Sequence, residues 1–519
     1  MAERKSVDVD GRRMELDAAS TLASALVSSG MSAIRRSAHG EARGPVCGMG
    51  SCYECRCTID GREHERACLS DVASVGRVET RPSSARSSAA PPERAHRRIA
   101  CDVLVVGAGP AGLAAAEHAA RRGKRVVLVD ENPGLGGQIW RADRGPESSR
   151  AREAVRANGV EVLVGANVVL ALDARRLRLA TRDAVIDARF TTLVLATGAT
   201  ELSLPFPGWT LPNVFGLGGL QALAKGGLDL RGKRVVLAGS GPLLLAVADV
   251  VARKGANVVR IAEQASRGAL ASFAVGLATR PSKLGQALGF AGRLGALRTS
   301  SWPVEARGRE RLEELVVRTP SGDETLPCDF AGVGFGLVPN GRLAALLGCA
   351  LDGRRVRVDG EQRTSVAHVF AAGECTGVGG KDKARVEGEI AGAAAAGDSE
   401  PARRLAGARA SEHAFVARLE RTFAPRAELR ALAREDTLVC RCEDVTRGEL
   451  ERAGAFSAGA TDEFAWRTSK LQTRTGMGAC QGRVCGPALE FLGGRAARDV
   501  RAPLVPVALD VLAAPTEDA

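Results

Sequence analysis

The stretch Asp-Val-Leu-Val-Val-Gly-Ala-Gly-Pro-Ala-Gly, residues 102–112, decides the fold class of this 519-residue chain. An apolar strand runs directly into a turn with the glycine spacing G-x-G-x-x-G. In dinucleotide-binding α/β folds the first glycine permits the tight turn, the second lets the backbone approach a pyrophosphate, and the third lets helix and strand pack closely. The N-terminus of the following helix then faces the phosphate charge. These residues predict a parallel α/β fold with a dinucleotide at the turn.

Further motifs favour FAD as that dinucleotide. The pair Asp130-Glu131 follows about 20 residues later, where a carboxylate would accept hydrogen bonds from the adenosine ribose. Gly136-Gly137 comes next, and Ala196-Thr197-Gly198 resembles the crossover segment of two-dinucleotide flavoproteins. Gly373-Glu374 resembles a late Gly-Asp motif, with Glu in place of the Asp that holds the flavin ribityl chain. The residues predicted to bind FAD are Gly107, Gly109, Pro110, Ala111, Gly112, Asp130, Glu131, Gly136, Gly137, Gln138, Thr197, Gly198, Gly373 and Glu374.

A second strand–turn–helix–strand unit lies within residues 234–263. Its turn carries Gly239 and Gly241, but Leu244 stands at the third glycine position, which should push the helix away from the strand. Glu263 ends the next strand, where it would suit the ribose hydroxyls of NAD. We predict that Gly239, Gly241 and Glu263 face a nucleotide; NAD(P), another adenine nucleotide and an empty site remain open. Disulfide reduction is disfavoured, because no cysteine pair accompanies either unit.

Thirteen cysteines are many for a chain expected in a reducing compartment, and most stand in two sets near the ends. The first set has the C-x4-C-x2-C spacing of plant-type [2Fe–2S] ferredoxins, with a fourth cysteine twelve residues further on. Gly48 and Gly50 would let the backbone wrap a cluster and direct N–H groups at its sulfides. Four thiolates also suit tetrahedral zinc, so zinc remains an alternative. The predicted ligands are Cys47, Cys52, Cys55 and Cys68.

The second set combines a C-x-C pair with a C-x4-C pair, with 37 residues between them. One pair can hold one iron while the other pair, on a helical turn, holds the second, and nearby glycines supply room. From spacing alone an iron–sulfur cluster, zinc and no metal all remain open. The candidate ligands are Cys440, Cys442, Cys480 and Cys485.

Length places these sites on more than one domain, because 519 residues exceed what one core usually serves. The predicted fold class is α/β, a flavoprotein with two nested Rossmann-like dinucleotide folds between a β-rich ferredoxin-like domain and a helical C-terminal domain. The predicted segments are a ferredoxin-like domain at 1–80, a flexible linker at 81–98, an FAD-binding domain in two parts at 99–230 and 331–400, an NAD(P)-type domain at 231–330 and a helical region at 401–519.

Composition disfavours some classes of function. Aromatic residues make up 3% of the chain, which is few for the stacking platforms that bind single-stranded nucleic acid. The net charge of +12 indicates a solvated basic surface, with a docking face for an acidic partner as the alternative. No apolar leader and no uninterrupted apolar stretch of membrane-spanning length occurs. We therefore expect a cytoplasmic chain with no nucleic acid partner and no membrane span.

The motifs together resemble a known family. Leu438–Thr446 and Thr475–Cys485 resemble the [2Fe–2S] domain of bacterioferritin-associated ferredoxin (BFD), which implies a BFD-like second cluster on the C-terminal cysteines. Asp130–Arg141, Leu204–Pro212 and Cys375–Gly380 resemble the α subunits of bacterial opine oxidases, hydrogen cyanide synthase and the D-hydroxyproline or proline dehydrogenases. In that family the ferredoxin is often a separate subunit, which here resembles a fused N-terminal domain. The resemblance implies a partner, a separate FAD-containing β subunit of D-amino-acid-oxidase type that oxidises the amine.

These cofactors predict a two-to-one electron converter, because a flavin takes two electrons and each [2Fe–2S] cluster carries one. The leading hypothesis is an electron-transfer subunit of an opine, hydroxyproline, proline, sarcosine or glycine dehydrogenase complex. The C–N bond would be oxidised on the β subunit, and the electrons would leave for a downstream acceptor other than O2. The alternatives are a stand-alone NAD(P)H-dependent ferredoxin-type reductase and a non-enzymatic redox sensor or scaffold. The six histidines supply no acid–base constellation, so no catalytic residue is predicted.

Overall fold

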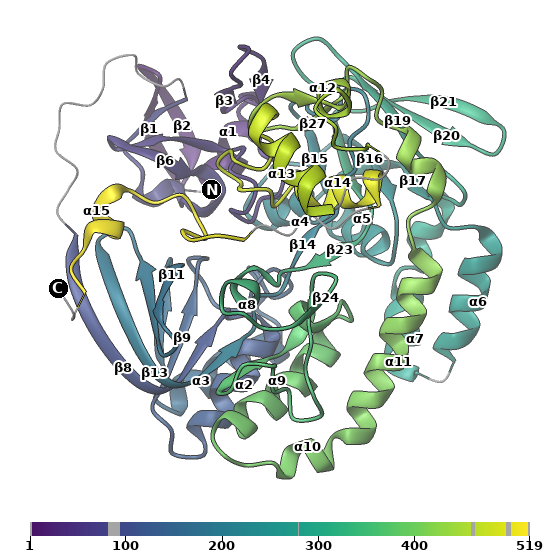
Figure 1. Ribbon diagram of the computed structural model, residues 1–519. Coiled ribbons are helices and arrows are strands. Elements are labelled where there is room, and N and C mark those ends of the chain that lie inside the picture. Colours follow the sequence, from purple (N-terminus) through teal and green to yellow (C-terminus); the bar gives the residue numbers. More distant parts are fainter. Residues whose placement is uncertain (1–2, 81–93, 279, 458–461, 495–499, 517–519) are drawn as a thin grey trace. The chain divides into compact units, whose positions relative to one another are not determined.

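The computed structural model describes residues 3–80, 94–278, 280–457, 462–494 and 500–516 (Figure 1). The chain folds into two compact units, each assembled from segments far apart in the sequence. The first consists of Met1–Ala90, Glu201–Gly336 and Arg418–Ala497, and the second of Pro91–Thr200, Leu337–Ala417 and Arg498–Ala519. Among the helices of the described part, none has the length and apolar character needed to cross a membrane.

The second unit is built on a seven-stranded, mostly parallel sheet. Its strands are β8 Ala95–Val106, β9 Val126–Asp130, β10 Glu161–Val164, β11 Asn167–Asp173, β12 Arg176–Ala180, β13 Ala184–Leu195 and β26 Val369–Ala371. The strand order is β10-β9-β8-β13-β12-β11, and β26 also pairs with β13. β8 begins at Ala95, so residues 95–98, expected in the linker, belong to this strand. Residues 81–93 of the expected linker lie outside the described residues.

Two helices of this unit, α2 Pro110–Ala120 and α9 Lys381–Ala395, pack closely together (Figure 1). A Cβ at Gly388 or Gly392 of α9 would lie 2.2 Å from a backbone oxygen of α2, so both positions require glycine. The two halves of the expected FAD-binding domain are therefore joined through this helix pair. The other elements in this part of the chain are α3 Pro146–Ala157, β14 Ala199–Glu201, β23 Leu337–Pro339, α8 Arg342–Leu346, β24 Leu351–Asp352, β25 Arg355–Val356, α10 Glu400–Arg404 and α15 Leu509–Ala513.

The first unit contains a second parallel sheet of five strands. Its elements in chain order are β15 Val214–Gly216, α4 Leu217–Lys225, β16 Arg234–Gly239, α5 Leu243–Arg253, β17 Asn257–Glu263, α6 Arg267–Leu277, α7 Pro281–Gly289, β18 Leu297–Arg298 and β22 Phe330–Gly334. The strand order is β15-β22-β16-β17-β18. The residues Val235–Ala238 of the central strand β16 are all 0% exposed, as in a parallel sheet covered on both faces. A three-stranded antiparallel sheet, β19 Trp302–Arg307, β20 Glu314–Thr319 and β21 Gly322–Pro327, accompanies it.

The N-terminal part of the first unit is a five-stranded sheet packed into the same core. Its elements are β1 Arg4–Val9, β2 Arg12–Asp17, α1 Leu22–Ser28, β3 Arg35–Arg36, β4 Ala42–Arg43, β5 Arg56–Ile59, β6 Arg62–Arg66 and β7 Arg77–Glu79. β1 and β2 form the expected hairpin, with Gly11 at a φ of +80° in the turn. Leu26 and Val78 belong to one buried cluster with Leu220 and Leu237 of the dinucleotide fold. The ferredoxin-like part therefore shares its hydrophobic core with the neighbouring fold.

The C-terminal part of the first unit carries the second cysteine set. Its elements, with the long helix before them, are α11 Ala406–Phe423, β27 Leu438–Cys440, β28 Val445–Thr446, α12 Arg447–Arg452, α13 Asp462–Thr473 and α14 Cys485–Gly493. This region is mostly helical, as expected, but its first two cysteines lie at a short antiparallel hairpin of β27 and β28. Thr446 and Glu449 then form a capping box that starts α12.

Candidate dinucleotide and iron–sulfur sites

The first Gly-rich turn connects β8 to α2 and leaves space beside its middle glycine. A Cβ at Gly107 or Gly112 would lie 2.2 or 1.7 Å from a backbone oxygen, so both positions require glycine for packing. At Gly109, by contrast, the nearest atom to such a Cβ is Gly137 Cα at 4.0 Å. This open side lies at the N-terminus of α2, which begins at Pro110. The turn therefore fits a pyrophosphate, as the glycine spacing predicts.

The other predicted FAD residues gather at the carboxyl edge of the same sheet. Asp130 ends β9, Thr197 follows β13 and Gly373 follows β26. Asp130 is 7% exposed, and its Oδ2 accepts a hydrogen bond at 2.5 Å from the N–H of Ala108 in the turn. Burial raises the pKa of Asp130 above its usual value. Gly136 donates its N–H to the Ala108 carbonyl at 2.8 Å, so the glycine pair also borders the turn.

The remaining predicted residues lie in the same region. Glu131, Gln138 and Gly198 are part-exposed, and Ala111 is buried in α2. Glu374 turns toward its own loop: Oε1 accepts hydrogen bonds from the N–H groups of Gly379 at 3.2 Å and Gly380 at 2.6 Å. Burial raises the pKa of Glu374. Its contact with a flavin ribityl chain stays a prediction.

Two buried charged residues that no sequence motif indicated hold the Gly373 turn in place. Lys383 and Glu387, one helical turn apart on α9, are 1% and 0% exposed. Lys383 Nζ donates to the Gly373 carbonyl at 2.8 Å, and Glu387 Oε2 accepts the Gly373 N–H at 2.9 Å. Burial alone would raise the pKa of Glu387, but a hydrogen bond from His413 and the charge of Lys383 outweigh it and hold this pKa at about 2. The only sequence signal was their i,i+4 spacing, which is common on exposed helices.

The second Gly-rich turn repeats the local geometry of the first. Gly239 has a φ of +140°, and a Cβ there would lie 1.7 Å from a backbone oxygen. Glu263, at the end of β17, accepts hydrogen bonds from the N–H groups of Gly241 at 2.7 Å and Ala265 at 2.8 Å. Burial raises the pKa of Glu263 to about 7. Leu244, at the place of the third glycine, is 1% exposed and belongs to the hydrophobic core.

The four N-terminal cysteines are buried and stand in two thiol pairs. Cys47 is hydrogen-bonded to Cys52, and Cys55 to Cys68. The Sγ of Cys47 also accepts hydrogen bonds from the N–H groups of Met49 and Cys52, each at 3.4 Å. The hydrogen bond from the Cys52 thiol, with these N–H groups, lowers the pKa of Cys47 to about 5. This favours the thiolate form that a metal ligand requires.

Glycines on both sides of a contact position this cysteine loop. Gly48 and Gly50 adopt left-handed φ angles of +58° and +82°, as expected for a loop that wraps around a cluster. On α4, a Cβ at Gly219 would lie 1.9 Å from the carbonyl oxygen of Val46. The same oxygen accepts the N–H of Gly216 at 3.0 Å. The dinucleotide fold thus presents glycines to the cysteine loop so that the two backbones can meet.

The four C-terminal cysteines also stand in two thiol pairs, but each pair joins the two halves of the set. Cys440 is hydrogen-bonded to Cys485, and Cys442 to Cys480. The expected division into a C-x-C pair and a C-x4-C pair is therefore not the pairing observed. Gly478 must be glycine here, because a Cβ would lie 2.3 Å from Cys442 Cβ. In the described part of the chain, no three His, Cys, Asp or Glu side chains gather closely enough to hold a single metal ion.

One narrow cavity is lined by cysteines of both sets. Its lining residues are Cys52, Glu54, Cys440, Arg441, Cys442, Cys480, Val484 and Cys485. Arg441 Nε donates to Glu54 Oε2 at 3.0 Å, and Arg35 Nη2 donates to Glu54 Oε1 at 2.5 Å. Burial alone would raise the pKa of Glu54, but Arg441 and Arg35 lower it, which keeps the carboxylate ionised. This buried ion triad of Arg35, Glu54 and Arg441 joins the two candidate ligand loops.

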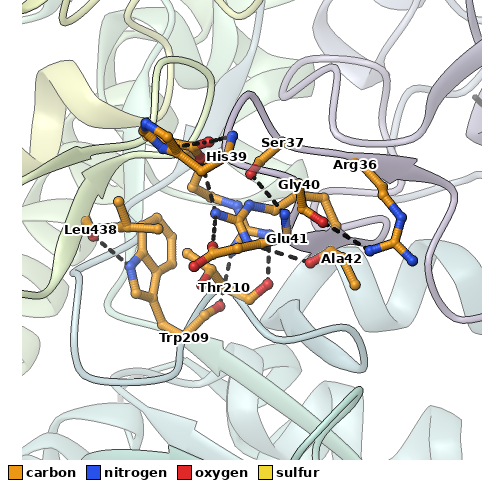
Figure 2. A network of polar contacts seen from close by, with 12 residues as sticks. Arg36, Ser37, His39, Gly40, Glu41, Ala42, Trp209, Thr210 and Leu438 are labelled. Carbon is orange, nitrogen blue, oxygen red and sulfur yellow. Dashed lines mark hydrogen bonds and ion pairs between the residues drawn. The ribbon is translucent and has the colours of Figure 1, made fainter. Parts of the chain in front are cut away.

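Further polar contacts surround the triad (Figure 2). Arg43 donates to Asp444 at 2.9 Å, and both side chains are 2% exposed. The guanidinium of Arg441 lies 4.9 Å from the ring centroid of Trp209 and donates to the Trp209 carbonyl at 2.9 Å. Trp209 Nε1 in turn donates to the Leu438 carbonyl at 2.7 Å, which Figure 2 shows. All three segments of the first unit therefore meet at this network.

Two protein families match the sequence. Residues 101–399 match the family described as pyridine nucleotide-disulphide oxidoreductase. Residues 3–82 match the 2Fe-2S iron-sulfur cluster binding domain. The chain is therefore a flavoprotein oxidoreductase with an N-terminal [2Fe–2S] domain, the class that its first glycine turn and first cysteine set indicated.

Relatives narrow this class. Hydrogen cyanide synthase subunit HcnB of Pseudomonas aeruginosa is 34% identical over 430 residues, which are 74% of this chain and 90% of that protein. An opine oxidase subunit of Agrobacterium tumefaciens is 31% identical over 431 residues, which are 74% of this chain and 84% of that protein. The crystal structure of L-proline dehydrogenase from P. horikoshii shares the fold, with a TM-score of 0.68 at 19% identity and 98% of each chain covered. The chain belongs to the family of HcnB and these opine oxidase subunits, which confirms the resemblance of its motifs.

Proposed function

We propose that this chain is the electron-transfer flavoprotein subunit of a complex that dehydrogenates an amine or imino acid of the opine, hydroxyproline, proline, sarcosine or glycine type. In this proposal FAD binds at the first Gly-rich turn, and each cysteine set carries one [2Fe–2S] cluster. The observation that supports it most is the cavity lined by cysteines of both sets. Two one-electron centres that share a wall can pass electrons directly between them.

The chain's own residues have distinct tasks in this proposal. Gly109 and the N-terminus of α2 receive the FAD pyrophosphate, and Asp130 lies where the adenosine ribose would bind. The buried thiols exclude water, and N–H groups directed at Cys47 stabilise its thiolate. Arg35 and Arg441 hold the two ligand loops together through Glu54. When bound, FAD exchanges electrons in pairs or singly, whereas each cluster exchanges one.

A partner protein follows from the relatives, whose names describe subunits of hydrogen cyanide synthase and opine oxidase. We assign the oxidation of the C–N bond to a separate FAD-containing β subunit of D-amino-acid-oxidase type, in the cytoplasm. This chain would accept the electrons and deliver them to a downstream acceptor other than O2. The substrate itself would then be recognised by the partner.

Metal analysis and electron paramagnetic resonance test the cofactor set. The protein purified without air should contain about four irons and four sulfides per chain, and after reduction it should give two [2Fe–2S] signals. Cys55→Ser should remove one signal and Cys480→Ser the other. Zinc in either site, or loss of both signals in either variant, would contradict the assignment.

Co-expression tests the complex. The chain and an amine-oxidase-type flavoprotein from a neighbouring reading frame are purified together and mixed anaerobically with proline, hydroxyproline, sarcosine, glycine or an opine. One of these substrates should reduce the clusters of this chain, and Cys55→Ser in the same complex should interrupt the transfer. Reduction of the isolated chain by any of these amines would show that it does not need the partner.

A further inference from the structure

The two Gly-rich turns share their local geometry but differ in what lies over them. In each turn, the acid at the end of the following strand accepts a hydrogen bond from a turn N–H, Asp130 in the first and Glu263 in the second. Yet the middle glycine of the first turn, Gly109, is part-exposed, whereas its counterpart Gly241 is buried. Another part of the protein must therefore cover the second turn.

The cover is the end of α11 and the residues after it. Ser240, in the turn, donates from Oγ to the carbonyl of Phe423 at 3.0 Å. Gln264, next to the acid of this turn, donates from Nε2 to the carbonyl of Ala424 at 3.1 Å. Its Oε1 accepts the N–H of Arg426 at 3.2 Å. Ser240 and Gln264 are 3% and 1% exposed, so the two polar side chains at the nucleotide position are used on the chain's own backbone.

The Phe423 ring closes the face of the middle glycine. Its Cγ lies 3.9 Å from where a Cβ of Gly241 would be, the direction that is open at Gly109. A dinucleotide turn receives the pyrophosphate on this glycine. The ring also packs edge-on against Phe273 of α6, with centroids 5.1 Å apart at 72°. The aromatic side chain therefore occupies the phosphate position and is held there from the other side.

Contacts before and after Phe423 fix the cover at both ends. A Cβ at Gly276 of α6 would lie 1.0 Å from Arg418 Nη1, so α6 leaves a gap that fits the end of α11. The guanidinium of Arg426 lies 5.1 Å from the ring centroid of Trp302. A dinucleotide could reach the turn only after all these contacts were broken.

We propose that the second turn is a docking socket for the chain's own residues 423–426, and that the chain therefore takes no hydride from NADH or NADPH. The residues of this turn do not fit the NAD(P) that its glycine spacing predicts. The socket has a structural task instead: it ties the chain to the dinucleotide sheet shortly before the second cysteine set begins at Cys440. Nicotinamide nucleotides are then excluded as electron donors at this turn.

Nucleotide titration of the holoprotein tests the exclusion. Protein with FAD and iron bound is titrated without air with NADH and then with NADPH, up to about a hundred times the Kd of a typical micromolar site. We expect no saturable heat in calorimetry and no bleaching of the flavin absorbance. One-to-one binding of either nucleotide to FAD-loaded protein, or flavin reduction within seconds, would overturn the proposal.

Hydrogen exchange tests the socket independently of any nucleotide. The Arg426 amide should exchange slowly in the wild type, and Gln264→Ala should accelerate its exchange at least tenfold because its acceptor is lost. The matched control Gln221→Ala, at a part-exposed residue of α4, should leave that amide unchanged. Fast exchange at residues 423–426 in the wild type, or faster exchange there after NADH is added, would show a displaceable gate in place of a socket.

Discussion

The buried ion triad predicts that Glu54→Gln weakens the link between the two cysteine loops. Glu54 lies 2.5 Å from Arg35 and 3.0 Å from Arg441, and the three side chains are 1%, 5% and 2% exposed. Glutamine keeps the size of the side chain and one acceptor oxygen, but it removes the charge. Two guanidiniums then remain buried together without a counter-charge.

The magnitude follows from these contacts. Unit charges about 3 Å apart attract by roughly 5 kcal/mol at an effective dielectric constant near 20, and desolvation of the charged groups offsets much of this. Removing one partner of a buried ion pair costs about 3–5 kcal/mol, because the remaining charge is left uncompensated. Since glutamine retains a hydrogen bond, we expect the lower end, about 3 kcal/mol. With a urea dependence of about 3 kcal/mol per molar, the unfolding midpoint should fall by about 1 M.

Urea unfolding of the anaerobic holoprotein measures this effect. Tryptophan fluorescence reports on the network, because Trp209 lies against Arg441, and visible absorbance reports on the clusters. Glu63→Gln, at an exposed residue of β6, serves as the matched control and should change stability by less than about 0.5 kcal/mol. Equal midpoints for the two variants would refute the structural role of the triad.

Three further predictions concern the other sites. Gly109→Val should lower the FAD content at least tenfold, whereas Gly134→Val, where a Cβ would meet nothing within 4 Å, should leave the flavin absorbance per chain unchanged. Gly219→Ala places a Cβ 1.9 Å from a backbone oxygen and should accelerate hydrogen exchange in residues 45–50; Gly268→Ala, with open space around it, should not. Glu387 has a folded pKa of about 2 against an ordinary value of 4.5, so it stabilises above pH 4.5, and that stability is lost as the pH falls toward 2. This amounts to about 3 kcal/mol, and Glu387→Gln should flatten the acid side of the thermal stability profile; an unchanged acid side would contradict the assignment.

Local patterns predicted local structure well. The apolar run before Gly107 is the end of β8, and the helix expected at Leu243–Arg253 is α5 with the same bounds. The hairpin around Gly11 is also as expected. Such features depend on residues a few positions apart, so periodicity and turn residues are sufficient to indicate them.

Long-range packing could not be predicted in this way. The hydrogen bond between Arg441 and Glu54 joins residues 387 positions apart, and that between Ser240 and Phe423 joins residues 183 positions apart. The glycine pattern at Gly239 and Gly241 is the same whether the turn receives a nucleotide or another segment of the chain. Only the position of Phe423 distinguishes the two cases, and no periodicity in the sequence encodes that position.

The places of Glu54 and Arg441 in their motifs explain how two cysteine loops can become one relay. Each lies between cysteines of its own set, where cysteine spacing alone leaves the residue type open. An opposite pair of charges at these two places joins the loops without using a thiol. Arg35 adds a second positive charge, so two guanidiniums against one carboxylate leave a net charge of about +1 between the two thiol sets. Because thiolate clusters are anionic and become more so on reduction, this surplus favours the reduced state while the ion pairs hold the loops together.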